Sequence, residues 1–464
     1  MSWRDTVRLQ LIVTVPAWLW GVVAPRRRFV PLLARWRAGQ RGMRFLEELR
    51  ERYGSTRLWT WFPFRRTLVV LDADGIDAVL ANEQNFADPT LKRHALSRFV
   101  PDALVISAGE PWRARRHFNE QVLDTGRPHA DRAAFARIVA DEVGRLAGAR
   151  NGELRWADFE SFGERVAQQI VLGEGRLEPA LKAQLACLAA RANLPLRHRK
   201  AFAGFYARID HHLERSAAGA GAAQAPPGLA RRAAAQHAQD GTTTPRPAPD
   251  SAAAPIRVPA QLAFWLFVLD DALELHVGRT LALVAAHPAA QARARAEIAA
   301  AGALTPEAID GLRFVEACIV EQLRLWTPVP LLLRRAVGTF SLGGTAIEPC
   351  DQILCHAGFV HRDMRRLGER ADRFVPESAA ARDELFVFSR HRQACAGETL
   401  VRFALKATLG ALLARYRVEL LSPAIDPERI AASIDHYGIA LRLHEEPAAP
   451  AAGGQAASAP RAAR

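Results

Sequence analysis

Paired cysteines are the first thing this sequence lacks. The chain has 464 residues and an odd number of cysteines, none in CxxC spacing: Cys187, Cys318, Cys350, Cys355 and Cys395. A disulfide framework and a CxxC zinc site are therefore not expected, and a reducing, cytoplasmic compartment fits better. Zinc-finger, RNP and basic-zipper patterns are also absent, so we expect no nucleic-acid partner despite a net charge of +13. No glycine-rich loop that could cradle a phosphate is present.

An uninterrupted hydrophobic run long enough to cross a bilayer is missing as well. The apolar stretch "LQLIVTVPAWLWGVVAP" has an internal proline, Pro16, and falls short of the roughly 20 residues of a spanning helix. It carries no convincing signal-peptide cleavage site. Two interpretations of residues 1–40 stay open. They form either a packed N-terminal helix, or an interfacial anchor that makes a peripheral membrane contact through residues 9–31.

What the sequence does contain is typical of a large globular protein. Hydrophobic residues make up 49% and charged residues 24% of the chain, so a core that encloses a sizeable ligand is expected. The patterns predict a hairpin at 58–72, helices through 110–150, 155–214, 258–288, 314–326 and 397–416, and a last hairpin at 434–444. The Ala/Pro-rich insert 217–258 is expected to be mostly loop, with one short helix at 228–238, and the tail 447–464 is expected to be disordered. The predicted fold class is mainly α with small β-sheets (α+β).

Cys395 stands in "FSRHRQACAGETL", a basic stretch at the start of the last predicted helix. The N-terminus of a helix favours an anion, so we expect a lowered pKa and a thiolate at this position. The residues alone leave two roles open for that thiolate: a metal ligand, or a nucleophile with His391 as its base.

Charged residues inside apolar helices give the second signal. In "FVEACIVEQLRLW", Glu321 and Arg324 are three residues apart and can pair on one face of the helix. Asp270 and Asp271 lie in the most apolar helix of the chain. Because an isolated buried carboxylate costs several kcal/mol, such residues are more often functional than incidental.

The order of these motifs resembles that of the cytochrome P450 family of haem-thiolate monooxygenases, of which the chain looks like a divergent, bacterial-type member. The resemblance covers roughly residues 40–445, and we take 41–446 as one catalytic domain. It includes "GEPWRARR", the long central helix, "EQLRLWTPVPLLLRRA" and the cysteine loop. It implies a P450 fold, with the central helix over a buried haem b.

The resemblance also implies a role for each matching residue. Cys395 would be the axial ligand, Phe388 would pack near its sulfur, and Gly397 would allow the helix start to approach the porphyrin. The haem propionates would be held by Trp112, Arg116, Arg334 and Gln393. Glu321 and Arg324 would form a structural ion pair. An acidic residue of the central helix would relay protons, Asp271 in preference to Asp270.

The resemblance implies an activity and partners too. The enzyme would insert one oxygen atom from O2 into a lipophilic small molecule of the secondary-metabolite or fatty-acyl type. Because the chain has no flavin or ferredoxin motif, electrons would come from a ferredoxin or flavodoxin with its reductase. Four arginines near the thiolate face are candidates for docking that partner, with solvated or propionate-bound side chains as the alternative: Arg113, Arg115, Arg390 and Arg392.

The chain departs from the family pattern at Gln393, at the missing glycine of the central helix and at three further positions, of which the missing threonine keeps other activities open. Ala272 replaces the threonine of the proton relay, and Ser378 replaces the arginine of the meander motif. His391 replaces a glycine, so the turn before Cys395 is expected to differ. The alternatives are a peroxygenase or a peroxide isomerase or dehydratase that needs no reductase, and a non-catalytic haem-binding protein.

Overall fold

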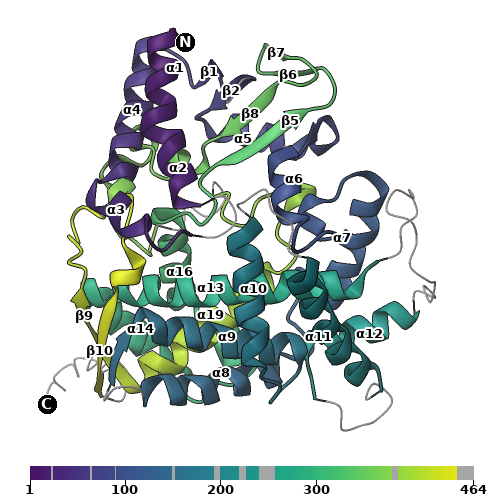
Figure 1. Cartoon of the computed structure of the whole chain (residues 1–464). Coiled ribbons are helices and arrows are strands. Elements are labelled where there is room, and N and C mark those ends of the chain that lie inside the picture. The colour runs from purple at the N-terminus through teal and green to yellow at the C-terminus, as the bar shows by residue number, and fades with distance from the viewer. Residues whose placement is uncertain are drawn as a thin grey trace, which may run out of the picture.

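The central helix organises the molecule. The computed structural model describes residues 1–21, 25–62, 65–88, 90–148, 152–192, 199–218, 226–239, 256–378 and 385–446. In Figure 1, α13 (Val258–Ala286) crosses the middle of the chain, with α16 on one side and α9 and α14 on the other. Most of its residues are buried, because a helix that is apolar on every face needs neighbours on every face.

The N-terminal part combines a helical rod with a sheet. The rod consists of α1 (Trp3–Leu9), the π-helical turn η1 (Gln10–Thr14) and α2 (Val15–Trp20), and is followed by α3 (Val30–Arg35) and α4 (Ala38–Tyr53). The five-stranded sheet has the order β1 (Arg57–Trp61), β2 (Arg66–Val70), β8 (Gln352–Cys355), β5 (Leu332–Ala336), β3 (Phe86–Ala87). Only β2 and β8 pair in parallel.

The remaining helices surround α13 or pack beside the five-stranded sheet, as α5 and α17 do. They are α5 (Ala73–Ala81), α6 (Thr90–Leu96), α7 (Gly109–Leu123), α8 (Arg132–Ala147), α9 (Trp156–Leu172), α10 (Pro179–Ala192), α11 (Arg199–Ala218), α12 (Leu229–Gln239), α14 (Pro288–Ala301), α15 (Pro306–Gly311), α16 (Arg313–Leu325), α17 (Ala357–Val360), α18 (Met364–Leu367) and α19 (Glu398–Arg415). The approach of α9 to α13 is close: a Cβ at Gly163 would lie 3.0 Å from the Asp270 carbonyl oxygen. This contact fixes the central helix at its acidic residues.

Short strands complete the fold. A three-stranded sheet has the order β4 (Glu153–Arg155), β10 (Ala440–Glu445), β9 (Tyr416–Ser422), and β6 (Phe340–Leu342) pairs with β7 (Thr345–Ile347). Single 3-10 turns lie at η2 (Glu83–Asn85), η3 (Leu104–Ile106), η5 (Gly368–Asp372), η7 (His391–Gln393) and η8 (His436–Gly438). The hairpin predicted at 434–444 is wrong in its first half: η8 occupies those residues, and β10 pairs with β9 instead.

The predicted fold class, mainly α with small sheets, is confirmed by this arrangement. Part of the insert 217–258 is ordered helix, because α12 buries Leu229, Ala230 and Ala233 and its Arg232 donates to the Val122 carbonyl (3.1 Å). Residues 219–225 and 240–255 and the tail 447–464 lie outside the described residues, and the domain boundaries stay a prediction. Among the described residues, no helix has the length and apolarity needed to span a bilayer.

Candidate active site

The cysteine loop is closed by its own backbone. The N–H of Cys395 donates to the Phe388 carbonyl at 2.7 Å, and Gly397 is the N-cap of α19. Ser389 and His391 both have a left-handed φ, 58° and 54°. Histidine in place of glycine has therefore not removed this conformation, contrary to the expected change of turn. The imidazole of His391 lies 3.0 Å from the Asp77 carboxylate, so it is not placed as a base for Cys395.

The thiol of Cys395 lies in a recess. Its surface is exposed, yet the chain around it displaces enough water that desolvation raises its pKa, and the Glu398 carboxylate adds to this. The backbone N–H groups of Gly397 and Glu398 and the charge of Arg116 oppose the shift. The lowered pKa that the sequence predicted is therefore wrong, because desolvation outweighs the helix N-terminus. The N–H groups are still aimed at the sulfur, as stabilisation of a thiolate requires.

Arg116, on α7, is joined to the residue next to the cysteine. Its Nη1 donates to the Ala394 carbonyl and its Nε to Glu120 (2.6 Å). Trp112, one turn earlier on α7, has the Arg392 guanidinium 6.0 Å above its ring. Two of the residues that sequence reasoning assigned to the propionates thus lie against the cysteine loop.

Arg334 approaches the same loop from β5. Its Nη2 donates to Oε1 of Gln393 at 2.8 Å, and its Nη1 lies 3.4 Å from the Asp88 carboxylate. The structure therefore brings together all four predicted propionate partners, two of them permanent cations, around residues 392–394. Such a cluster can bind carboxylates.

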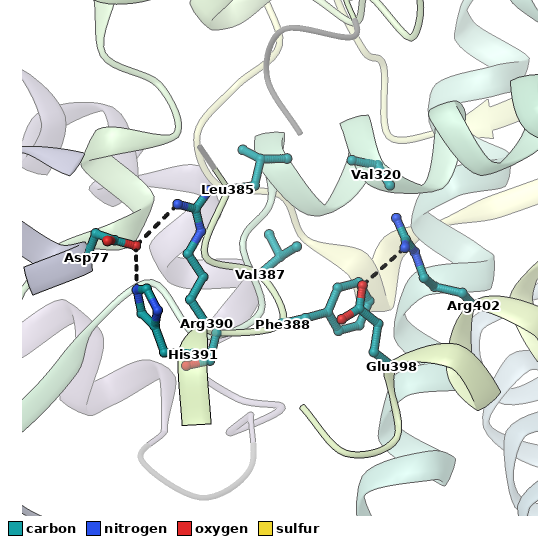
Figure 2. Close-up of a pocket in the computed structure, with 10 residues that line it drawn as sticks. Asp77, Val320, Leu385, Val387, Phe388, Arg390, His391, Glu398 and Arg402 are labelled. Atoms are coloured by element: carbon teal, nitrogen blue, oxygen red, sulfur yellow. Dashed lines mark hydrogen bonds and ion pairs between the residues drawn. The ribbon is translucent and has the colours of Figure 1, made fainter. Parts of the chain in front are cut away.

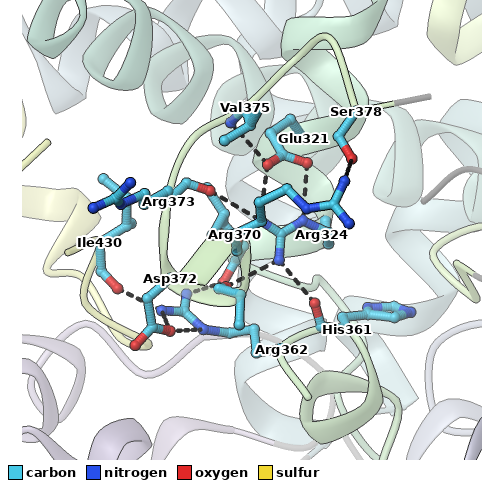
Figure 3. A network of polar contacts seen from close by, with 12 residues as sticks. Glu321, Arg324, His361, Arg362, Arg370, Asp372, Arg373, Val375, Ser378 and Ile430 are labelled. Carbon is cyan, nitrogen blue, oxygen red and sulfur yellow. Dashed lines mark hydrogen bonds and ion pairs between the residues drawn. The ribbon is translucent and has the colours of Figure 1, made fainter. Parts of the chain in front are cut away.

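Glu321 and Arg324 form a buried ion pair on α16 (Figure 3). Nε and Nη2 of Arg324 donate to the two carboxylate oxygens of Glu321 at 2.9 and 2.8 Å, and Glu321 also accepts from the N–H of Val375 (3.0 Å). Arg324 donates further to the carbonyls of His361, Arg370, Ala371 and Arg373. The pair thus ties α16 to the segment 361–375. Ser378, which replaces an arginine of the family pattern, accepts from Arg370 (2.8 Å).

The acidic residues of α13 lie in different surroundings. Asp270 points to Lys182 of α10 (3.7 Å), and desolvation raises the pKa of its carboxyl to about 7. Desolvation raises the pKa of Asp271 to about 6, and the charge of Arg279 two turns further on opposes the rise. Asp270 therefore has a cation within 4 Å, whereas among the described residues Asp271 has no ion pair this close and interacts with Arg279 only at longer range.

Sequence reasoning missed Glu274 and Lys182. Glu274 lies one turn after the two aspartates, and desolvation, together with their charges, raises its pKa to about 9. The spacing of three and four residues in "DDALE" could have identified it as a neighbour of both. Lys182 could not be found this way, because only the fold brings α10 to α13.

A cavity of about 520 Å³ adjoins the cysteine loop (Figure 2). It is lined by Leu385 and residues 387–391, together with Asp77, Val320, Glu398 and Arg402; Cys395 is not among the lining residues. Arg390 pairs with Asp77 (3.2 Å) and Arg402 with Glu398 (3.1 Å) at opposite ends. Arg115, which the sequence offered as a docking residue, is instead buried and paired with Asp102 (2.9 Å).

Comparison with known proteins agrees with this geometry. A family model described as cytochrome P450 matches residues 277–434, which include Glu321, Arg324 and Cys395. Residues 277–434 of this chain therefore belong to the cytochrome P450 family. Its fold resembles the P450 structure described as retinoic acid bound cyanobacterial CYP120A1, with a TM-score of 0.68, 18% identity, and 86% of this chain and 94% of the other covered.

Curated P450 relatives match over a shorter stretch. Cytochrome P450 CYP72A616 of Paris polyphylla is 30% identical over 30% of this chain and 29% of its own length. Cytochrome P450 monooxygenase pkfB of Emericella nidulans is 32% identical over 31% and 30%. The P450 chain therefore aligns with less than a third of these relatives. The family as a whole binds haem through a cysteine thiolate.

Proposed function

We propose that this P450 chain is a haem-dependent monooxygenase that inserts one oxygen atom from O2 into a lipophilic small molecule. The observation that carries the proposal is Cys395: an exposed thiol in a recess at the start of α19, with the N–H groups of Gly397 and Glu398 aimed at its sulfur. Such a cysteine suits a thiolate ligand of iron. Haem b bound there would supply the reductive activation of oxygen.

The surroundings of Cys395 fit a flat macrocycle. A Cβ built on Gly397 would meet nothing within 4 Å, so the helix start is open on that side. Val268, about a third of the way along the central helix, is 37% exposed although neighbouring helices surround α13. These accessible residues support a haem site between α13 and the cysteine loop.

Chain residues can hold such a group in place. Arg116 and Arg334 offer guanidinium N–H donors for two carboxylates, and Gln393 and Trp112 add neutral donors. Phe388 is joined to Cys395 by the backbone hydrogen bond to its carbonyl, and its ring would pack beside the sulfur. The ion pair Glu321–Arg324 would keep the loop in shape by fixing residues 361–375.

Proton supply in this proposal depends on carboxyl groups. Ala272 has no hydroxyl, so the acidic residues of α13 must hold and pass the proton alone or through water. We favour Asp271 for the proton relay, in agreement with the sequence analysis, because Asp270 pairs with Lys182. The raised pKa of both residues, about 6 and 7, allows each to hold a proton near neutral pH.

Electrons are proposed to come from a ferredoxin or flavodoxin with its reductase, in the cytoplasm. The exposed Arg392 and the cavity end at Arg390 offer basic groups beside the loop for an acidic partner. All five cysteines are free thiols, as a reducing compartment requires. A secondary metabolite or fatty-acyl compound is the proposed substrate class.

The test is the carbon-monoxide difference spectrum of the reduced, haem-loaded protein. We expect a thiolate-type Soret band, which Cys395→Ser abolishes while Cys350→Ser, at another exposed cysteine, leaves it intact. A histidine-type band in the parent protein would overturn the assignment.

One observation favours a second candidate. Because Ala272 cannot provide the hydroxyl of the usual relay, a peroxide-driven reaction, as a peroxygenase or a peroxide isomerase or dehydratase, is the alternative. Product formation from peroxide without any reductase would favour it. No spectral response to any lipophilic compound, with no turnover by either route, would instead indicate a non-catalytic haem-binding protein.

A further inference from the structure

The N-terminal rod is apolar on two opposite faces. One face is core: Leu9 and Val13 are buried with Phe45 and Leu46 of α4 and with Leu58 of β1. The other face is open to solvent. There the rod exposes Trp3 (73%), Val7, Leu11 (62%), Val15 and Trp18 (54%), five of the large hydrophobic residues that the described chain leaves exposed. In Figure 1 the rod lies at the edge of the molecule, beside α4.

The π-helical turn keeps these side chains in line. In a regular α-helix a step of four residues overshoots one turn by about 40°, so a series with this spacing winds off its face. The wider turn η1 (Gln10–Thr14) lies in the middle of the series and absorbs the overshoot. Trp61 of β1 extends the stripe, because its carbonyl accepts from Gln10 of the rod (2.9 Å) and its ring is exposed. We call the stripe and Trp61 the outer apolar face.

Positive charge is concentrated in the N-terminal segment that contains the rod and β1. Residues 1–66 contain fourteen arginines, no lysine and four acidic residues, a net charge of +10 out of +13 for the whole chain. Arg4, Arg28 and Arg65 are exposed, and none has an acidic partner within 4 Å among the described residues. Arg4 follows Trp3, and Arg65 lies in the hairpin next to Trp61.

We propose that the outer apolar face and its arginines dock this protein on an anionic lipid bilayer, with the rod lying flat in the interface. Aromatic and aliphatic side chains would enter the headgroup boundary, and the arginines would contact acidic lipids. The opposite face of the rod is occupied by the core, and no helix of the described chain can span the membrane. The protein therefore lies on the bilayer.

A second copy of the chain is a poorer partner for this face. In a symmetric dimer the same patch meets itself, so two N-terminal parts with a charge of +10 each would be brought together. An anionic surface neutralises this charge, and an apolar boundary covers the stripe. The positive charge and the apolar stripe together therefore favour a lipid surface over a second copy of the chain.

The experiment is flotation of the haem-loaded, full-length protein with vesicles of phosphatidylcholine, with and without phosphatidylglycerol. We expect binding to the anionic vesicles, weakened by high salt. The double variant Leu11→Glu/Trp18→Glu should lower binding at least about tenfold, because it places charge where apolar side chains enter the boundary. Its control is Val337→Glu/Met364→Glu, which makes the same charge change at exposed apolar residues of other elements.

A triple variant and its control test the contribution of the N-terminal arginines to lipid binding. Arg4→Gln/Arg28→Gln/Arg65→Gln should lower binding to anionic vesicles on the order of 100-fold, at about fivefold per arginine. The control is Arg145→Gln/Arg313→Gln/Arg415→Gln, at arginines exposed elsewhere. Equal loss in variants and controls, no binding by the parent, or a dimer that Leu11→Glu/Trp18→Glu dissociates would each overturn the proposal. An unchanged carbon-monoxide spectrum in all variants separates this result from the proposed monooxygenase function.

Discussion

Replacing Glu321 with glutamine tests how much the buried ion pair contributes to the stability of the fold. The side chains of Glu321 and Arg324 are almost fully buried and joined by two hydrogen bonds. Glutamine keeps one acceptor oxygen but turns an N–H donor toward the guanidinium, so one donor loses its partner. Arg324 also becomes a buried charge that has only neutral acceptors around it, the amide oxygen and the backbone carbonyls. Breaking a buried pair in this way costs about 3–5 kcal/mol.

A matched control exists in the same chain. Glu110 and Arg113 have the same residue types, order and spacing and a 2.7 Å contact, but both side chains are mostly exposed. Glu110→Gln should therefore cost less than about 1 kcal/mol. The measurement is the urea midpoint by far-UV circular dichroism, with haem loading kept equal because the cofactor is coupled to unfolding. If Glu321→Gln costs no more than Glu110→Gln, burial does not make this pair important and the reasoning fails.

Three further substitutions have expected outcomes. Ser389→Gly should raise stability by about 1 kcal/mol over Ser389→Ala in urea unfolding, because Ser389 has a left-handed φ of 58°; equal midpoints would contradict this. Glu274 has a pKa raised from 4.5 to about 9, so between these values the folded protein holds a proton that the unfolded chain loses, and stability falls as pH rises. Glu274→Gln should remove this fall, seen as a flatter plot of urea midpoint against pH; a parallel plot would refute it. Gly163→Ala should destabilise by about 1–3 kcal/mol in thermal unfolding, since its Cβ would lie 3.0 Å from the Asp270 carbonyl, whereas Gly144→Ala, with open space around it, should not.

The sequence predicted most of what depends on neighbouring residues. The periodicity of 258–288 indicated the central helix, because a long helix that is apolar on every face is stable only when protein surrounds it. The spacing of Glu321 and Arg324 indicated their pairing, because a step of three residues places two side chains on one face of a helix. The cysteine loop was found because its signal lies within thirteen consecutive residues.

What the sequence could not give depends on contacts between distant segments. Lys182 reaches Asp270 only because α10 folds against α13, 88 positions away in the chain. Arg115 looked like a surface residue in "WRARR", but Asp102 pairs with it in the folded chain and it is buried. The direction in which the pKa of Cys395 shifts could not be predicted either, because it too depends on distant segments. A helix N-terminus is a local feature, whereas the desolvation that outweighs it comes from the whole environment of the thiol.

The N-terminal charge could have been predicted from the sequence, but only by counting net charge segment by segment. Averaged over 464 residues, a charge of +13 is unremarkable in an arginine-rich chain and by itself indicates little about function. Counted by segment, +10 falls within residues 1–66. The exposure of Leu11 and Trp18 could not be predicted in the same way, because a rod apolar on both faces has no polar face to mark its solvent side. Only the position of α4 against Leu9 and Val13 decides which face is left open. The concentration of charge could have been predicted from the sequence, whereas the outer apolar face beside it could not.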